Sequence, residues 1–286
     1  MRCSPDHRSG SAPSPDPEEF KRFEAQSWSE RADSYDRLIR HVTEAAAPAL
    51  LDASGVAAGM RVLDLGCGRG HTSAAIAERG AQPLGVDIAE GMLEAARELH
   101  PGLEFAQGDA EHLAFGDASF DAVAGGFTVN HLPVPERGAA EAARVVRPGG
   151  RVAFSVWDTP ERTPLIGMLG DAVERAGLAR DEAVPDGPDG LRFADGDEFA
   201  SLLSRAGLVD VRVESLELTC EVAGADELWD GLVGGTVRSS SAVLALGSDE
   251  RQQVRECFDE LAAEYGVPGG GLRVPAVVRI ASGRRL

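Results

Sequence analysis

The chain has 286 residues, of which 43% are hydrophobic, and a formal net charge of −19 at pH 7. This length suffices for one large α/β domain, and the negative surface disfavours a nucleic-acid partner because it would repel the phosphate backbone. No apolar run reaches membrane-spanning length, and the Cys and His residues form neither a C-x-x-C nor an H-E-x-x-H pattern, so we expect a cytoplasmic protein without a metal site or membrane partner.

The first 58 residues divide into two parts by composition. Residues 1–17 are rich in Ser, Pro, Asp and Gly and are expected to be a disordered leader. From Glu18 the composition becomes helical, and residues 18–58 include the aromatic positions Trp28 and Tyr35. One domain is expected to extend from residue 18 to 286.

An apolar run followed by alternate glycines is the most informative stretch of the chain. Residues 61–65 indicate a buried strand, Gly66, Gly68 and Gly70 interrupt it, and residues 72–79 have helical composition. Strand, glycine turn and helix begin a βαβ nucleotide site, where the missing Cβ atoms let a ligand lie against the backbone.

Three carboxylates accompany this turn. Asp64 lies two residues before the first glycine, Asp87 ends the next apolar run, and Asp109 follows another short strand. A negative charge beside the turn would repel a phosphate but suit an ammonium or sulfonium group, and Asp87 is placed to accept hydrogen bonds from two ribose hydroxyls. The third glycine also comes one residue early for the G-x-G-x-x-G loop of NAD proteins. These features favour a cationic nucleoside without phosphates, such as S-adenosylmethionine (SAM).

Predicted strands and helices alternate through the rest of the chain. Further helices are expected at 92–99, 136–146, 164–179, 197–206, 225–233 and 249–265, and further strands at 122–124, 151–157, 209–218 and 274–281. His131 follows the strand 122–124, where ligands of open parallel sheets lie, and imidazole titrates near neutral pH. His131 is therefore the best candidate for a general base, and the alternative is a histidine that caps the next helix or packs over the cofactor.

Four segments occur in a characteristic order and spacing: VLDLGCGRG, GVDIAEGMLEAAR, QGDAEHLAFGDASFDAV and VVRPGGRVAFSVWD. Together they resemble the core of class I SAM-dependent methyltransferases that act on small molecules, as in ubiquinone and menaquinone biosynthesis. The resemblance implies an α/β, Rossmann-like fold. Its seven-stranded sheet would be mostly parallel, with helices on both faces and a reversed last hairpin.

The resemblance also implies the cofactor site. Residues 18–58 would form a helical lid, in which Trp28 and Tyr35 either close over the methionine end of SAM or anchor the lid to the core. Ile88 would contact the adenine face, and Asp109 with Ala110 would flank its edge. The full set of expected cofactor-binding residues is Trp28, Tyr35, Asp64, Gly66, Cys67, Gly68, Gly70, Asp87, Ile88, Met92, Asp109, Ala110, Glu111, Phe127 and His131.

Two segments, 159–192 and 222–270, are longer than connections in a compact α/β core need to be. Their apolar helices follow strand ends, so we expect them to form a helical cap over the acceptor pocket. The alternative is that they pack in a homo-oligomer, as the N-terminal helices also could.

The predicted function is transfer of a methyl group from SAM to O, N or C of a small acceptor. The apolar cap favours a lipophilic acceptor or a secondary metabolite. Two alternatives stay open: a SAM-binding cyclase or rearrangement enzyme that transfers no methyl group, and an NAD(P)-binding module, which the loop acid and the early third glycine disfavour.

Overall fold

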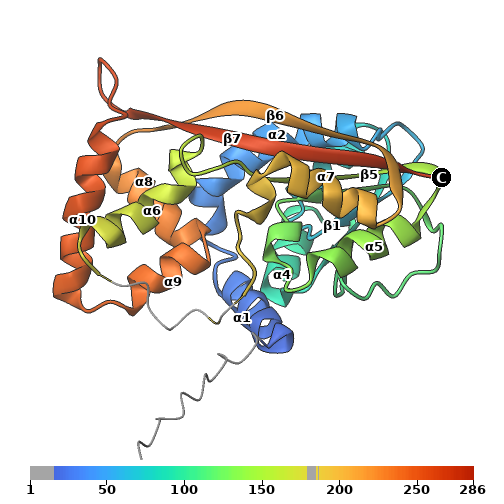
Figure 1. Ribbon diagram of the computed structural model, residues 1–286, viewed down its shortest axis with the longest axis horizontal. Helices are drawn as coiled ribbons and strands as arrows, with labels where there is room; N and C mark the ends of the chain where they lie inside the picture. Colours follow the sequence, from blue (N-terminus) through green and yellow to red (C-terminus); the bar gives the residue numbers. More distant parts are fainter. Residues whose placement is uncertain (1–15, 179–184, 186) are drawn as a thin grey trace, which may run out of the picture.

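The computed structural model in Figure 1 describes residues 16–178, 185 and 187–286. The predicted leader therefore lies outside the described residues up to residue 15. Helix α1 (Pro17–Glu30) begins at Pro17 because the Asp16 carboxylate caps it, accepting a hydrogen bond from the Glu18 N–H at 3.0 Å.

Seven strands form one sheet in the order β3-β2-β1-β4-β5-β7-β6. Their bounds are β1 Arg61–Leu65, β2 Gln82–Asp87, β3 Glu104–Gln107, β4 Phe120–Gly126, β5 Val146–Trp157, β6 Leu208–Val222 and β7 Leu272–Arg285. The first five strands pair in parallel, and β7 runs antiparallel to both β5 and β6. The predicted mostly parallel sheet with a reversed last hairpin is confirmed.

Helices cover both faces of the sheet, as predicted. Besides α1, the α-helices are α2 Ile39–Ala53, α3 His71–Glu78, α4 Glu90–Leu99, α5 Pro135–Val145, α6 Pro164–Arg175, α7 Gly196–Arg205, α8 Ala225–Gly235, α9 Arg238–Ala245 and α10 Ser248–Ala263. Side chains alternate between the faces of a strand. In β1, Val62 accordingly packs in a cluster with α2 and α3, whereas Leu63 packs in a second cluster with α5 and α7.

Strands β6 and β7 extend beyond the rest of the sheet. The pairing of β7 with β5 stops at Val278 opposite Trp157, but its pairing with β6 continues to Leu272 opposite Val222. In Figure 1 this ribbon runs the length of the molecule, and α6, α8, α9 and α10 gather at one end of it. Helix α6 from the first insertion packs against α10 from the second. The two insertions thus meet, and Leu165, Leu228 and Phe258 belong to the same buried cluster as Val62.

Some predicted boundaries are wrong. Strand β5 begins at Val146 rather than Arg151 because Val146 already pairs with Phe120, ahead of a bulge in the β4–β5 register. Helix α6 ends at Arg175 rather than at 179. Helix α9 and the short 3-10 helices η1 (Tyr35–Arg37), η2 (Val129–His131) and η3 (Arg192–Ala194) were not predicted. None of the helices within the described ranges is both long and apolar enough to cross a bilayer.

Candidate functional site

A cavity of about 560 Å³ lies at the carboxyl ends of β1, β2, β4 and β5. Helix α1 and the segment after it form one wall, and the insertion helices α6 and α9 form another. This is the edge at which parallel α/β sheets bind ligands. Most of the residues predicted from the sequence meet here.

The glycine turn forms the floor of the cavity. Gly66, Gly68 and Gly70 have φ angles of +69°, +52° and +83°, in the left-handed region that L-residues with side chains rarely adopt. A Cβ on Gly66 would lie 2.3 Å from Thr128 Oγ1, whereas Gly68 has open space where its Cβ would be. Gly66 and Gly68 line the cavity, while Gly70 precedes α3. The thiol of Cys67 between them is buried, and burial raises its pKa well above the ordinary value, which makes it unreactive.

Asp87 ends β2 beside the turn and lines the cavity. Its Oδ2 accepts a hydrogen bond from the Gly68 N–H at 2.8 Å, and its Oδ1 accepts one from the Ala89 N–H at 2.9 Å. Burial raises the pKa of this carboxyl, which the backbone hydrogen bonds partly offset. Each carboxylate oxygen retains a second lone pair for a ligand hydroxyl. Ile88 and Met92 line the cavity next to it.

Asp64 lies behind the turn rather than in the cavity wall. It is 1% exposed, and its Oδ2 accepts a hydrogen bond from the Ser73 hydroxyl of α3 at 2.6 Å. Its Oδ1 is buried without a hydrogen-bond partner among the described residues. Burial raises the pKa of Asp64 to about 7. The negative charge assigned to this residue is therefore only partly developed at neutral pH.

A lysine on α1 pairs with two carboxylates in the loop after β3. Lys21 Nζ lies 2.8 Å from Asp109 Oδ2 and 3.3 Å from Glu111 Oε2. Burial alone would raise the pKa of Asp109, but the hydrogen bond and charge of Lys21 hold it below its ordinary value. Asp109 and Ala110 line the cavity, whereas Glu111 is 2% exposed and accepts the Val134 N–H at 2.6 Å. The loop is thereby fixed from both sides.

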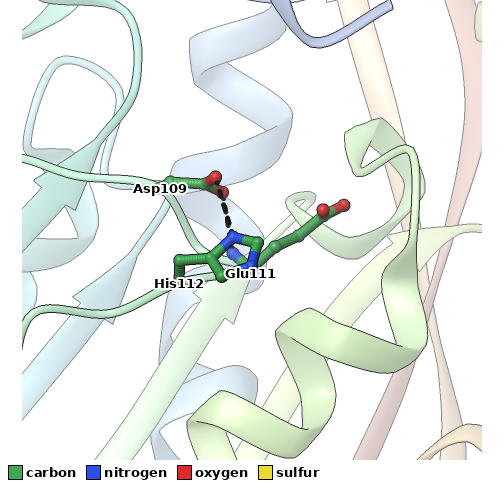
Figure 2. A group of neighbouring side chains, drawn as sticks. All are labelled: Asp109, Glu111 and His112. Carbon is green, nitrogen blue, oxygen red and sulfur yellow. Dashed lines mark hydrogen bonds and ion pairs between the residues drawn. The ribbon is translucent and has the colours of Figure 1, made fainter. Parts of the chain in front are cut away.

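Figure 2 shows the three side chains in this loop that have metal-ligand chemistry. Potential ligand atoms of Asp109, Glu111 and His112 lie within 4.8 Å of one another. His112 Nδ1 is 3.3 Å from Asp109, but the Glu111 carboxylate points away from this pair. The ammonium of Lys21 already pairs with both carboxylates, so a metal ion would have to displace it.

His131 lies in η2, directly after β4, and lines the cavity. Its Nδ1 is 3.0 Å from Glu24 Oε2, and its ring meets that of Trp28 edge-on with centroids 5.3 Å apart. Trp28 in turn lies 6.0 Å from Tyr35, whose hydroxyl donates to Thr43 Oγ1 at 3.2 Å. Burial raises the pKa of Tyr35 to about 12, so this phenol stays protonated.

Besides Lys21, the charged residues Glu24 and Arg238 line the cavity and were not predicted. Glu24 of α1 is 4% exposed and accepts hydrogen bonds from Trp28 Nε1 at 3.0 Å and from Arg238 Nε at 2.8 Å. Arg238 comes from α9, in the second insertion. For Lys21 and Glu24 the helical spacing of α1 could have indicated burial, because both lie on the buried face of that helix with Phe20.

Phe127 occupies the bend at the end of β4. Its φ of +53° is an outlier for an aromatic residue, and its N–H donates to the Ser155 carbonyl at 2.9 Å. Its ring packs on Trp157, with centroids 4.4 Å apart. Both rings face the cavity between the glycine turn and the insertions. Strained backbone of this kind is characteristic of ligand sites.

Comparisons with known proteins agree with this geometry. A family model described as "Methyltransferase domain" matches residues 63–154. A demethylmenaquinone methyltransferase of Beutenbergia cavernae is 35% identical over 158 residues, which are 55% of this chain and 63% of the relative. Another, of Mycobacterium sp. (strain KMS), is 32% identical over 192 residues, or 67% of this chain and 79% of the relative.

The fold also occurs among solved structures. The YcgJ protein of Bacillus subtilis is similar with a TM-score of 0.56 and 20% identity, and the match covers 84% of this chain and 97% of that protein. Similarity at this level of identity concerns the fold alone. The chain covers less than two thirds of the length of the Beutenbergia relative, 63%.

Proposed function

Because the chain belongs to the class I SAM-dependent methyltransferase family, we propose that it transfers the methyl group of SAM to an O, N or C atom of a small, lipophilic acceptor. The observation that carries this proposal is a single cavity in which the glycine turn, Asp87 and His131 face a largely apolar wall from α6 and α9. A donor and an acceptor can share such a cavity, since its volume is within the range of ligand sites.

The residues of the turn fit SAM. The open space at Gly68 lets the nucleoside approach the backbone, and Asp87 retains lone pairs for the two ribose hydroxyls. Ile88 and Met92 offer an apolar face to adenine, with Asp109 and Ala110 at its edge. The site offers no cluster of basic side chains for a pyrophosphate among its described residues, which supports a phosphate-free ligand over NAD(P).

When bound, SAM supplies a methyl carbon made electrophilic by the sulfonium group. The chain contributes alignment of the acceptor and exclusion of water, which account for most of the rate enhancement in such reactions. His131 accepts the proton that the acceptor loses, a step worth roughly 10²–10⁴-fold. Trp28 and Tyr35 close the methionine end of the site.

The far wall supports an uncharged acceptor. Ile166, Val173 and Ala242 line it, together with Trp157, whereas the carboxylate residues Asp171 and Asp189, which also line the cavity, are exposed to solvent. The one carboxylate at the end of β5, Asp158, is fully buried and paired with Arg279 at 2.9 Å, so it presents no free charge. Because relatives of this chain are named demethylmenaquinone methyltransferases, a quinol with a short apolar tail is the first acceptor to test.

The test combines the purified chain with isotope-labelled SAM and a panel of quinols, phenols and lipophilic metabolites, followed by mass spectrometry. The proposal expects a product in which one labelled methyl group replaces one hydrogen of the substrate, formed together with the demethylated nucleoside. A product with the mass of its substrate would support a SAM-binding cyclase or rearrangement enzyme instead. Binding of NAD(P) in place of SAM would contradict both.

A further inference from the structure

A carboxylate on helix α1 meets the imidazole that follows β4. Glu24 Oε2 is 3.0 Å from His131 Nδ1, although the two residues are 107 positions apart in the chain. The side chain of Glu24 is 5% exposed, whereas that of His131 is 27% exposed and lines the cavity. Glu24 also lines the cavity, but its carboxylate is engaged by His131, Trp28 and Arg238.

The chemistry of a carboxylate decides how the imidazole is protonated. An ionised carboxylate only accepts hydrogen bonds, so Nδ1 of His131 must carry the proton that it donates to Glu24. In the neutral ring the lone pair then lies on Nε2, the nitrogen that is not engaged by Glu24. This is the tautomer that a proton acceptor facing the cavity requires.

Both His131 and Arg238 favour the ionised form of Glu24. Burial to 4% exposure would raise the pKa of Glu24, but the hydrogen bond and charge of His131, when its ring is protonated, and those of Arg238 more than offset it and hold this pKa below its ordinary value. When the ring is neutral, Arg238 is the cation that remains. Arg238 also donates to the Asn130 carbonyl at 3.0 Å, and it therefore ties α9 to the residue before His131. A neutral Glu24 could instead donate to Nδ1 and reverse the tautomer.

We propose that Glu24 is a positioning residue that holds the ring of His131 with Nδ1–H toward its own carboxylate and Nε2 toward the acceptor. The proposal rests on the function of His131 as general base. As the acceptor atom bonds to the methyl carbon and the carbon–sulfur bond breaks, its proton moves to Nε2 of His131. Glu24 gains no proton and stabilises the imidazolium that forms. Three elements, α1, η2 and α9, must therefore meet before the base is complete.

The sharpest variant is Glu24→Gln. We expect the amide oxygen to face Arg238, because a full positive charge outweighs the neutral indole N–H of Trp28 that also donates to Glu24. The amide N–H₂ then donates to Nδ1 of His131 and places the ring proton on Nε2. The matched control is Glu30→Gln, the same change on the same helix at an exposed carboxylate, which accepts a hydrogen bond from the Gln26 side chain at 2.9 Å.

The first readout is independent of any acceptor. Nitrogen NMR of protein with labelled histidine, recorded over a pH series that reaches the neutral form of the ring, reports the tautomer of His131, which is assigned by comparison with His131→Gln. We expect the Nδ1–H form in the wild type and in Glu30→Gln, and the Nε2–H form in Glu24→Gln. An Nε2–H form in the wild type would overturn the proposal, whether or not the variants fold.

The second readout is turnover with the acceptor found by the mass-spectrometric screen. Glu24→Gln is expected to lower kcat roughly 10–100-fold while the Kd of SAM changes less than about threefold, because the carboxylate of Glu24 is engaged by protein groups and not by SAM. An unchanged kcat with a reversed tautomer would contradict the positioning role. An unchanged kcat in His131→Gln would refute the base itself, which is a failure of the proposed function and leaves the NMR result standing.

Discussion

In the proposed site, Asp87 is the residue on which we expect SAM binding to depend most directly. Asp87→Ala would remove the acceptors proposed for two ribose hydroxyls, together with those of the Gly68 and Ala89 N–H groups. At about 1 kcal/mol for each net hydrogen bond, the Kd of SAM should rise roughly 10–100-fold. Calorimetric titration measures this. Asp52→Ala, which removes an exposed carboxylate paired with Arg79, is the charge-matched control and should bind as the wild type does.

Asp64 gives a prediction about pH. Its pKa is about 7 in the folded chain and about 4 when unfolded, so between these values only the folded state keeps the proton. The free energy of unfolding should therefore fall as the pH rises from about 4 to 7, by at most about 1.4 kcal/mol for each pH unit. Asp64→Asn should abolish this pH-dependent fall in the free energy of unfolding, because asparagine does not titrate.

Urea unfolding of Asp64→Asn and wild type across this pH range is the measurement. The variant should gain stability relative to the wild type as the pH rises, and the difference should level off above about pH 7. A difference that does not vary with pH would mean that Asp64 titrates normally in the folded chain.

The residues of the glycine turn could be predicted from the sequence, whereas the partners of His131 could not. Gly66, Gly68 and Asp87 belong to one local unit of strand, turn and strand, whose spacing specifies its geometry. Glu24 and Arg238 are 214 positions apart. Their approach depends on how α1 and α9 pack on the sheet, and no local pattern carries that information.

At the scale of elements, the one lysine of α1 joins that helix to the loop after β3. Lys21→Met leaves Asp109 and the fully buried side chain of Glu111 without their cation. Breaking a buried ion pair in this way should cost about 2–4 kcal/mol of unfolding free energy. Arg22→Met, at an exposed position of the same helix, should change stability little.

Chemical denaturation checks this prediction, and a double mutant sharpens it. Glu111→Gln added to Lys21→Met removes the unpaired buried charge and should recover part of the lost stability. If the two substitutions were simply additive, the pair of Lys21 with Glu111 would contribute nothing.

A substitution in helix α9 can probe the acceptor end of the cavity. Ala242 lines the cavity, so Ala242→Trp should fill the acceptor space and raise the KM for the acceptor at least about tenfold, while SAM affinity is kept. Leu244→Trp on the same helix is the control, because Leu244 is 46% exposed. Equal loss of SAM and acceptor binding would argue against separate donor and acceptor ends.

The sequence pattern predicted the regular strands and most helices, but not α9. Its sequence, Arg238–Ala245, contains three consecutive serines, which have weak helix propensity. Tertiary contacts hold it instead: Arg31, the residue that follows α1, donates to the side chains of Ser240 and Ser241, each at 3.2 Å. Conversely, the Gly-containing start of β5 pairs with β4 because of the sheet and not because of its local sequence.

At the scale of the whole molecule, the insertions are part of the core. Leu228 and Phe258 of the second insertion share a buried cluster with Leu50 and Val62 of the α/β unit. Removing an insertion would therefore expose the core. Single substitutions that face the cavity are the appropriate probes of the proposed cap, rather than deletions.

The central claim is that the cavity binds a cationic, phosphate-free adenosine compound. Calorimetric titration of the wild-type chain with SAM, its demethylated product and NAD tests it most directly. We predict saturable binding of SAM and of the demethylated nucleoside at one site per chain, and no binding of NAD. Saturable binding of NAD with no binding of SAM would contradict the account.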